Sequence, residues 1–358
     1  MDQLSYFNRL LLQCRSGFEK EAAAEITDQC ANVGIYGYCK LNLGDGYVLF
    51  ILQQPGDAEK AIDLVNFNSL VFIRQWMVCG DLLMLEQGDR ISQIQTYLDD
   101  FPSCADLWAE YADTTDGREL ATFSRKFSSA LSQKLRQSKQ LQSKVTQSSL
   151  RMFLFVLSGT EIYLGYAPVN NSAPWPLGIP RLKFPKSAPS RSTLKLEEAW
   201  HWFIPKKHWD QRLPYSAKAV DLGAAPGGWT WQLVQRSMFV TAVDNGPMND
   251  DLMESGQVTH VQEDAYRYQP PEPVHLMVCD VVDKPVKTAQ MAVTWVKNGW
   301  CNEAIFNLKL PMKQRYQEVI TCLNLIAEQF MQAGLAYELS AKHLYHDREE
   351  ITCHLRLL

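Results

Sequence analysis

A glycine-rich segment, Asp221-Leu-Gly-Ala-Ala-Pro-Gly-Gly-Trp-Thr230, points most directly to chemistry. It follows an apolar strand pattern and precedes an apolar helical pattern, so it predicts a strand, a tight turn and a helix. Glycines at 223, 227 and 228 let the backbone approach a bound molecule closely. Their spacing is not the G-x-G-x-x-G of pyrophosphate-binding loops. The second strand of this region ends in Asp244, an acid placed to hydrogen-bond ribose hydroxyls, which together predicts a nucleoside site.

Four further polar residues are expected to meet near this loop. Lys195 lies in a predicted helix, 192–199, that begins at a Ser or Thr N-cap. Asp280 ends the predicted strand 274–280, Lys309 lies near the end of the strand 303–310, and Glu350 begins the last strand. A lysine at the end of an apolar strand is costly unless it is paired. Taken singly, each of these residues also fits an ordinary surface ion pair.

The loop D-L-G-A-x-P-G-G-W-[ST] and the order Lys195, Asp280, Lys309, Glu350 resemble the FtsJ-like ribose 2′-O-methyltransferases. The resemblance implies S-adenosyl-L-methionine as cofactor and these four residues as a catalytic tetrad. Glu349 is an adjacent alternative to Glu350. This chain has Ala225 where the family often has Cys, a small-residue exchange that is tolerated if the backbone makes the contact.

A ribose 2′-hydroxyl is a weak nucleophile, so its proton must be removed. A lysine that is partly desolvated and close to other cations has a lowered pKa and serves as a base. We assign that role to Lys309, with Asp280 and Lys195 orienting and tuning it and Glu350 holding the far side. The methyl donor needs mainly in-line positioning, which proximity supplies.

The cofactor contacts follow from the strand ends. We expect the methionine part to be wrapped by four loop residues, Ala225, Pro226, Gly227 and Gly228. We expect Asp264, after the third strand, to reach the adenine amine, with its neighbour Glu263 as the alternative, and Asp280 to face the cofactor's amino group as well. The resemblance adds Ser192 to this set.

Segments 188–199, 221–230 and 343–350 are similar to FtsJ-like enzymes that act on large-subunit ribosomal RNA, and the likeness covers essentially the whole chain. It implies 2′-O-methylation of a cytidine in the peptidyl-transferase region of 23S rRNA. The expected partner is 23S rRNA or a large-subunit precursor. The resemblance also implies a THUMP-type RNA-binding domain, whereas the oligomeric state and the form of the substrate stay open.

The chain is expected to divide into four parts. An N-terminal α+β subdomain covers 1–54, a THUMP-like domain covers 55–166, a linker covers 167–190, and the methyltransferase domain covers 191–358. Six of the 17 prolines lie within 168–189, which marks the linker. Strands and helices alternate after it, so the fold class is α/β: a parallel, doubly wound Rossmann-like sheet with helices on both faces, preceded by an α+β region. Within that region, one predicted strand covers 70–78.

The 358 residues include nine cysteines without a C-x-x-C pair, which favours reduced thiols. Neither the cysteines nor the seven histidines show a metal-ligand spacing, and the chemistry described above needs no metal. There is no signal-peptide pattern and no apolar run of membrane-spanning length. These features predict a cytoplasmic protein that binds neither a metal nor a membrane.

Charge is unevenly distributed along the chain. Residues 120–218 contain 16 Lys or Arg against 4 Asp or Glu, in a protein with a net charge of −5. Residues 124–149 form part of this basic region, and Phe127, Ala130, Leu131 and Leu135 fall at helical spacing within them. We interpret the segment as a basic amphipathic helix facing RNA, although a solvated basic surface would produce the same pattern.

Two other functions fit parts of the sequence. A base methyltransferase needs an Asn/Asp-Pro-Pro-aromatic loop or a nucleophilic cysteine after the fourth strand, where this chain has Asp280-Val-Val-Asp283. A non-catalytic rRNA-binding assembly factor, or a methyltransferase acting on another RNA, is the remaining alternative. The intact set of two lysines and two acids argues against a non-catalytic role.

The basic region makes a prediction about salt dependence. Changing Arg125, Lys134, Arg136 and Lys139 together to Glu should weaken RNA binding and flatten its salt dependence. Each lost phosphate contact should reduce the slope of log K against log salt by roughly 0.7–0.9. RNA binding across a salt series checks this, with cofactor affinity as the control that should not change. Equal affinities and slopes for wild type and variant would show that the basic surface does not contact RNA.

Overall fold

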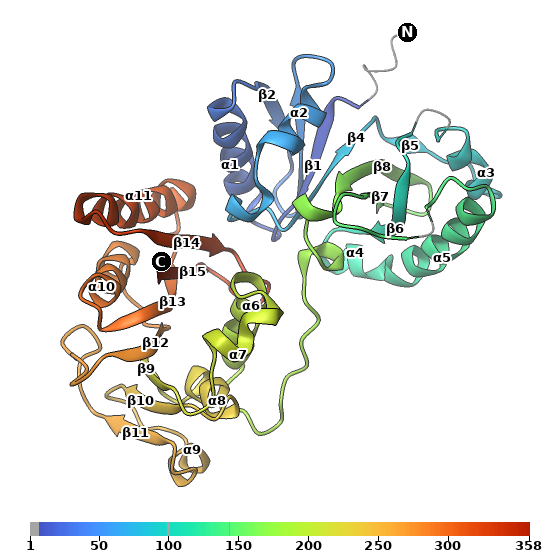
Figure 1. The fold of residues 1–358 in the computed structure, drawn as a ribbon. Helices are drawn as coiled ribbons and strands as arrows, with labels where there is room; N and C mark the ends of the chain where they lie inside the picture. Colours follow the sequence, from blue (N-terminus) through green and yellow to red (C-terminus); the bar gives the residue numbers. More distant parts are fainter. Residues whose placement is uncertain (1–6, 99–100, 143) are drawn as a thin grey trace. The chain divides into compact units, whose positions relative to one another are not determined.

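The computed structural model describes residues 7–98, 101–142 and 144–358 (Figure 1). The chain divides between residues 179 and 180 into two compact units. This division falls inside the predicted linker 167–190, while the other predicted boundaries stay predictions. Each unit is built around its own sheet.

The N-terminal unit mixes strands and helices, which confirms the expected α+β character. Its strands are β1 (Arg9–Gln13), β2 (Gly37–Lys40), β3 (Tyr47–Leu52), β4 (Gln75–Cys79), β5 (Leu83–Met84), β6 (Cys104–Glu110), β7 (Leu150–Val156) and β8 (Glu161–Pro168). Its α-helices are α1 (Glu19–Asn32), α2 (Asp57–Leu64), α3 (Arg90–Gln95), α4 (Thr115–Glu119) and α5 (Ala121–Gln137). Within the described residues, the strands form one sheet in the order β2-β3-β1-β4-β8-β7-β6, with β5 paired to β8.

The predicted strand over residues 70–78 was wrong in its first half, because pairing begins only at Gln75. The buried carboxylate of Glu25, on α1, accepts hydrogen bonds from the backbone N–H groups of Val71, Phe72 and Ile73 at 2.5, 2.9 and 3.2 Å. These donors are therefore satisfied by a side chain instead of a neighbouring strand. A local pattern of apolar residues does not reveal such a distant acceptor.

The basic segment forms helix α5, which ends at Gln137, well before the predicted 149. Phe127, Leu131 and Leu135 are buried on one side, as their spacing predicts, whereas Ala130 is exposed. Beyond the helix, Lys139 adopts a φ of 60°, which turns the chain out of the helical direction. The basic side chains of α5 are exposed, so the helix presents positive charge to solvent.

The C-terminal unit has strands β9 (Lys218–Leu222), β10 (Phe239–Val243), β11 (Val258–Val261), β12 (Val274–Cys279), β13 (Cys301–Lys309), β14 (Tyr337–Lys342) and β15 (Glu350–Leu357). Its α-helices are α6 (Thr193–Phe203), α7 (Trp209–Arg212), α8 (Gly228–Gln235), α9 (Asp250–Glu254), α10 (Pro285–Lys297) and α11 (Arg315–Ala333). The sheet order is β11-β10-β9-β12-β13-β15-β14. The expected α/β class is confirmed.

The expectation of a wholly parallel sheet was wrong at one edge. Strands β9 to β13 pair in parallel, but β15 pairs antiparallel with both β13 and β14. The connection 343–349 between β14 and β15 is short and contains no helix, so it cannot make the crossover that a parallel pair requires. This reversal brings the start of β15 beside the end of β13.

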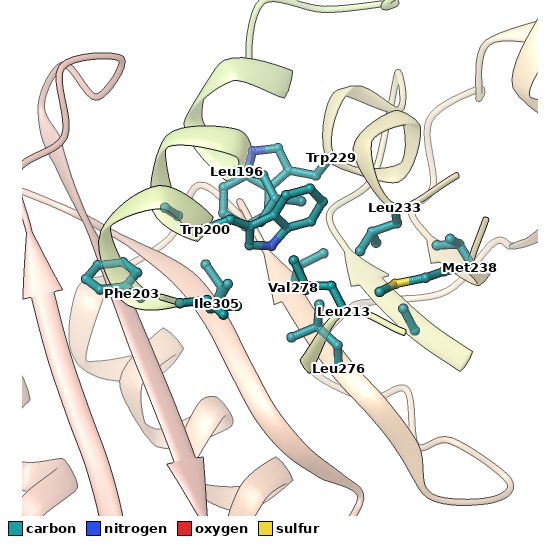
Figure 2. Packing of buried hydrophobic residues seen from close by; sticks show 14 of the residues in the cluster. Leu196, Trp200, Phe203, Leu213, Trp229, Leu233, Met238, Leu276, Val278 and Ile305 are labelled. Carbon is teal, nitrogen blue, oxygen red and sulfur yellow. The ribbon is translucent and has the colours of Figure 1, made fainter. Parts of the chain in front are cut away.

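Helix α6 is fixed on the sheet by large apolar side chains (Figure 2). Leu196, Trp200 and Phe203 belong to a buried cluster that also contains Val278 of β12 and Ile305 of β13. Trp200 is only 2% exposed, so its indole ring is part of the core. This packing fixes the position of α6 on the sheet, and with it the position of the polar side chains that the helix carries.

A buried ion pair ties α7 to the sheet. Arg212 donates to both carboxylate oxygens of Glu303 at 3.1 and 2.5 Å, and His354 Nε2 lies 2.9 Å from the same carboxylate. Burial would raise the pKa of Glu303, but hydrogen bonds from His354 and Arg212 outweigh it and hold that pKa below its ordinary value. The pair thus requires an ionised Glu303 on β13.

Removing the arginine should leave a buried carboxylate without its cation. Arg212→Met should lower the free energy of unfolding by about 3–5 kcal/mol at neutral pH. Because the folded-state pKa of Glu303 is lowered, its contribution is present above the ordinary glutamate pKa and is lost as the pH falls through the folded value. The deficit of the variant should therefore shrink on acidification, as measured by denaturant unfolding at several pH values.

Lys218→Met is the matched control, since Lys218 pairs with Glu272 on the surface. Such exposed pairs contribute roughly 0–1 kcal/mol. A deficit for Arg212→Met that is no larger than this, or that grows on acidification, would contradict the role given to Glu303.

Candidate active site and nucleoside-binding loop

The glycine-rich loop connects β9 to α8, as the sequence predicts. Gly223 and Gly227 have φ angles of +75° and +115°, in the region that favours glycine. The first and last residues of the motif are joined by a hydrogen bond, because Thr230 Oγ1 donates to the buried Asp221 carboxylate at 2.6 Å. Burial raises the pKa of Asp221 to about 7, and the Thr230 hydrogen bond opposes it only in part.

The glycines also make room for other parts of the same chain. A Cβ atom on Gly228 would lie 2.0 Å from Ser192 Oγ, and one on Gly227 would lie 2.3 Å from Leu252 Cδ1. The space beside Gly227 is thus occupied by a residue of α9. Ser192 occupies the N-cap position of α6 without a side-chain capping hydrogen bond, and its hydroxyl donates to Ser190 Oγ at 3.1 Å. The loop is therefore packed against the start of α6 and against α9.

Asp244 follows β10 and holds the loop from the other side. Its Oδ2 accepts a hydrogen bond from Ala225 N at 3.0 Å, and its Oδ1 accepts one from Gly246 N at 2.7 Å. The side chain is half-buried. Each carboxylate oxygen has more than one lone pair, so Asp244 retains acceptor capacity for two hydroxyl groups.

Asp264 and Glu263 lie beyond the end of β11, the neighbour of β10 in the sheet. Asp264 is exposed, and its Oδ1 accepts from Tyr266 N at 2.8 Å. Glu263 is half-buried. Both acids therefore lie near the edge of the sheet that carries the loop, and the geometry leaves both available as contacts.

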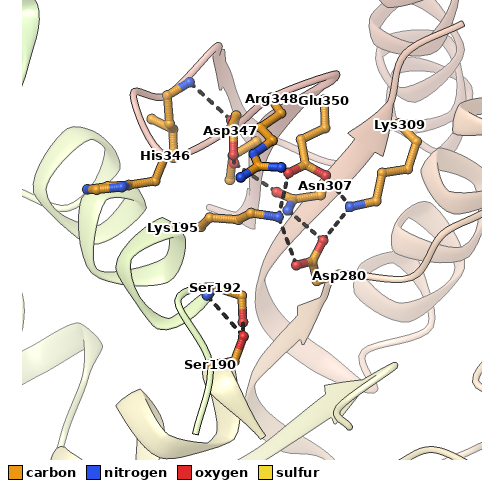
Figure 3. A network of polar contacts seen from close by, with 12 residues as sticks. Ser190, Ser192, Lys195, Asp280, Asn307, Lys309, His346, Asp347, Arg348 and Glu350 are labelled. Carbon is orange, nitrogen blue, oxygen red and sulfur yellow. Dashed lines mark hydrogen bonds and ion pairs between the residues drawn. The ribbon is translucent and has the colours of Figure 1, made fainter. Parts of the chain in front are cut away.

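The two predicted lysines and the two predicted acids form one compact cluster (Figure 3). Lys195 Nζ contacts Asp280 Oδ2 at 3.1 Å, and Lys309 Nζ contacts Asp280 Oδ1 at 2.6 Å. Both lysines also form ion pairs with Glu350. Glu349, the alternative, instead pairs with Arg315 and is exposed. Glu350 is thus the glutamate that completes the cluster.

All four side chains are largely shielded from water. Their exposed fractions are 15% for Lys195, 17% for Asp280, 19% for Lys309 and 8% for Glu350. Burial would lower the pKa of Lys195, but Asp280 and Glu350 outweigh it and raise that pKa. Burial would raise the pKa of Asp280, but the two lysines outweigh it and lower that pKa. The cluster therefore favours the charged forms of Lys195 and Asp280.

Sequence reasoning missed a second layer of polar residues behind this cluster. Asn307 Nδ2 donates to Asp280 Oδ1 at 2.8 Å, and Thr352 Oγ1 lies 2.8 Å from Asn307 Oδ1. Glu198, one helical turn after Lys195, accepts from the backbone N–H groups of Tyr345 and His346 at 2.8 and 3.0 Å. Asn307, a polar residue inside an apolar strand, was the signal that could have identified this layer.

Three protein-family models match the chain. Residues 7–77 match the RlmM ferredoxin-like domain, and residues 89–168 match the N-terminal model of ribosomal RNA large subunit methyltransferase M. Residues 188–331 match the FtsJ-like methyltransferase model, which covers the loop, Lys195, Asp280 and Lys309.

Curated relatives match over nearly the whole length. Proteins called ribosomal RNA large subunit methyltransferase M from Ectopseudomonas mendocina and Cellvibrio japonicus are each 52% identical, over 98% of this chain and 99% of theirs. The chain belongs to the ribosomal RNA large subunit methyltransferase M family. The resemblance predicted from the loop and the tetrad is confirmed at the level of this family, whose methyltransferase part is FtsJ-like.

Two negative findings apply to residues 7–98, 101–142 and 144–358. There, His, Cys, Asp and Glu side chains form no group able to hold a metal ion. No helix among them combines the length and the apolar character needed to span a bilayer.

The position of Asp244 makes a prediction about nucleoside binding. Asp244→Ala should weaken S-adenosylmethionine binding by roughly 10- to 100-fold, since hydrogen bonds to a charged group contribute about 1.5–3 kcal/mol. The change also removes the acceptor for Ala225 N and Gly246 N, which loosens the loop. Titration calorimetry measures the affinity, and Asp250→Ala, an exposed acid on α9, is the control that should bind normally. Wild-type affinity in Asp244→Ala would remove Asp244 from the site.

Proposed function

We propose that this protein transfers a methyl group from S-adenosylmethionine to the 2′-hydroxyl of a cytidine ribose in the peptidyl-transferase region of 23S rRNA. One observation carries the proposal. Two lysines from different elements share both Asp280 and Glu350, and the helix that carries one of them packs against the glycine-rich loop through Ser192. Family membership supports ribosomal RNA as the substrate class.

The residues around the loop suit an adenosine-containing sulfonium. Asp244 has acceptor capacity for the ribose hydroxyls, and Asp264, or Glu263 beside it, would accept from the adenine amine. Ala225, Pro226, Gly227 and Gly228 would surround the methionine part together with Ser192, and the ionised Asp280 would attract its amino group. The bound cofactor supplies an electrophilic methyl group that needs no further activation.

The cluster then supplies the base. The raised pKa of Lys195 keeps it a cation, so Lys195 would hold Asp280 and Glu350 and add positive charge beside Lys309. Lys309, in its neutral form, would take the proton of the 2′-hydroxyl while the oxygen attacks the methyl carbon. The transfer would form a C–O bond at the substrate oxygen and break the C–S bond of the donor, whose sulfur would keep the bonding electron pair, while Lys309 would hold the proton.

RNA contacts outside the site are also part of the proposal. The exposed basic residues of α5 lie in a region with an excess of positive charge. The segment 181–191 of the C-terminal unit contributes further exposed Lys and Arg. Phosphate contacts of this kind position RNA without reading its sequence. We propose that the N-terminal unit is the RNA-binding part, with the domain boundaries predicted above.

The decisive test is methyl transfer from labelled cofactor to 23S rRNA that lacks its modifications, offered as naked RNA and as large-subunit precursor particles. Nucleoside mapping should locate the label on the 2′-oxygen of one cytidine. Label on a base, or on another class of RNA, would replace this substrate assignment. RNA binding without transfer on either substrate would favour an assembly factor.

Lys309→Ala should remove the base while sparing the fold. A lost general base costs roughly 10²–10⁴-fold in rate. Single-turnover methyl transfer measures this loss, and calorimetry with the cofactor should show binding near the wild-type value. Lys297→Ala changes a lysine at the exposed end of α10 and should retain the wild-type rate. A wild-type rate in Lys309→Ala would show that another group accepts the proton.

A further inference from the structure

A fully buried carboxyl group lies behind the cluster of Lys195, Asp280, Lys309 and Glu350. Asp347 is 0% exposed, and its Oδ2 accepts a hydrogen bond from Leu344 N at 3.0 Å. Thr352 Oγ1 lies within 3.2 Å of both oxygens of Asp347, at 3.2 and 3.0 Å. The same hydroxyl oxygen is 2.8 Å from Asn307 Oδ1. Asp347 is therefore linked to Asp280 through two neutral side chains.

The donor and acceptor roles along this link follow from the contacts of Asp280. Its carboxylate accepts from Lys309 and is the acceptor for the Asn307 amide at 2.8 Å, so the amide nitrogen must face it. The reversed amide would place an oxygen against a carboxylate oxygen. With the nitrogen on Asp280, Asn307 Oδ1 faces Thr352 and needs a donor, because Asn307 is fully buried.

The hydroxyl of Thr352 has a single proton to donate. If it donates to Asn307 Oδ1, only the lone pairs of Thr352 Oγ1 face Asp347, and an ionised Asp347 would meet them with acceptors of its own. If the proton went to Asp347 instead, the buried Asn307 oxygen would lose its donor, at a cost of about 1–3 kcal/mol. Both contacts are satisfied together only when Asp347 carries a proton and donates it to Thr352.

The surroundings favour a neutral Asp347. Burial raises its pKa well above the ordinary value, and the neighbouring carboxylates Glu350 and Glu198 raise it further. Lys195 and the Leu344 N–H group act in the opposite direction and do not outweigh them. The hydrogen-bond geometry and the electrostatics therefore agree.

We propose that Asp347 is a neutral carboxylic acid that donates to Thr352, and that the directed chain Asp347–Thr352–Asn307–Asp280 holds the Asp280 carboxylate against Lys309. Asp347 touches neither substrate nor cofactor in this scheme and is a positioning residue. The inference rests on the proposed function only for its effect on rate, since the protonation state of Asp347 is a property of the folded protein.

The protonation state is tested directly by NMR of the full-length protein with ¹³C-labelled Asp carboxyl groups. Asp347→Asn identifies the Asp347 signal by its loss. That signal should have the chemical shift of a protonated acid at neutral pH. A shift typical of an ionised carboxylate overturns the proposal, whatever the result of any methyl-transfer assay.

The effect on catalysis is tested with two matched pairs. Asn at 347 can donate to Thr352 and accept from Leu344, so Asp347→Asn should restore most of the kcat lost in Asp347→Ala. We expect kcat to fall roughly 10–100-fold in Asp347→Ala, the range typical of residues that orient a functional side chain through hydrogen bonds. The KM for cofactor should change little. Equal losses in Asp347→Asn and Asp347→Ala, or no loss in either, would overturn the positioning role.

Two variants of Thr352 distinguish a positioning role from an effect on folding. Thr352→Ser keeps the hydroxyl and should retain activity, whereas Thr352→Val keeps the shape, removes the link and should lower kcat. Thermal unfolding of all four variants shows whether each folds. A Thr352→Val protein with wild-type kcat would overturn the proposed chain of hydrogen bonds, even if Asp347→Ala proved too unstable to assay.

Discussion

The sharing of Asp280 and Glu350 by two lysines dictates how the elements of the C-terminal unit must be arranged. Two ammonium groups that are mostly removed from water would be costly without carboxylates in direct contact. Each carboxylate here contacts both lysines, so none of the four charges can move without affecting the others. The fold must therefore bring α6, the end of β12, the end of β13 and the start of β15 to one place.

The antiparallel strand β15 makes this convergence possible. Lys309 ends β13 and Glu350 begins β15, and the two residues are direct partners in the register of the pair. In a parallel pair, the end of β15 would lie beside Lys309 and Glu350 would lie at the opposite edge of the sheet. The reversal at this edge thus places an acid from the C-terminal segment in the site at the carboxyl ends of the parallel strands.

Helix α6 connects the glycine-rich loop to the cluster of Lys195, Asp280, Lys309 and Glu350. Its N-cap residue, Ser192, lies against Gly228 in the glycine-rich loop, Lys195 reaches the charged cluster, and Glu198 binds the backbone of the segment before β15. These positions recur every three residues, so they lie along one side of the helix. The apolar side of α6, with Leu196 and Trp200, is buried in the core and keeps that polar side in place (Figure 2).

The amino-acid sequence was sufficient to predict those features that local chemistry encodes. The glycine loop, Asp244 after its strand, the α/β alternation and the four charged residues could all be predicted, because turns, strand ends and charged residues beside apolar segments leave local signals. Contacts between distant residues were needed to choose Glu350 over Glu349, to show that β15 runs antiparallel, and to shorten the predicted strand 70–78, whose first residues donate to Glu25 instead. They also placed Asn307, Thr352 and Asp347 behind the cluster. Each of these depends on contacts between residues distant in sequence, whose partners no local pattern specifies.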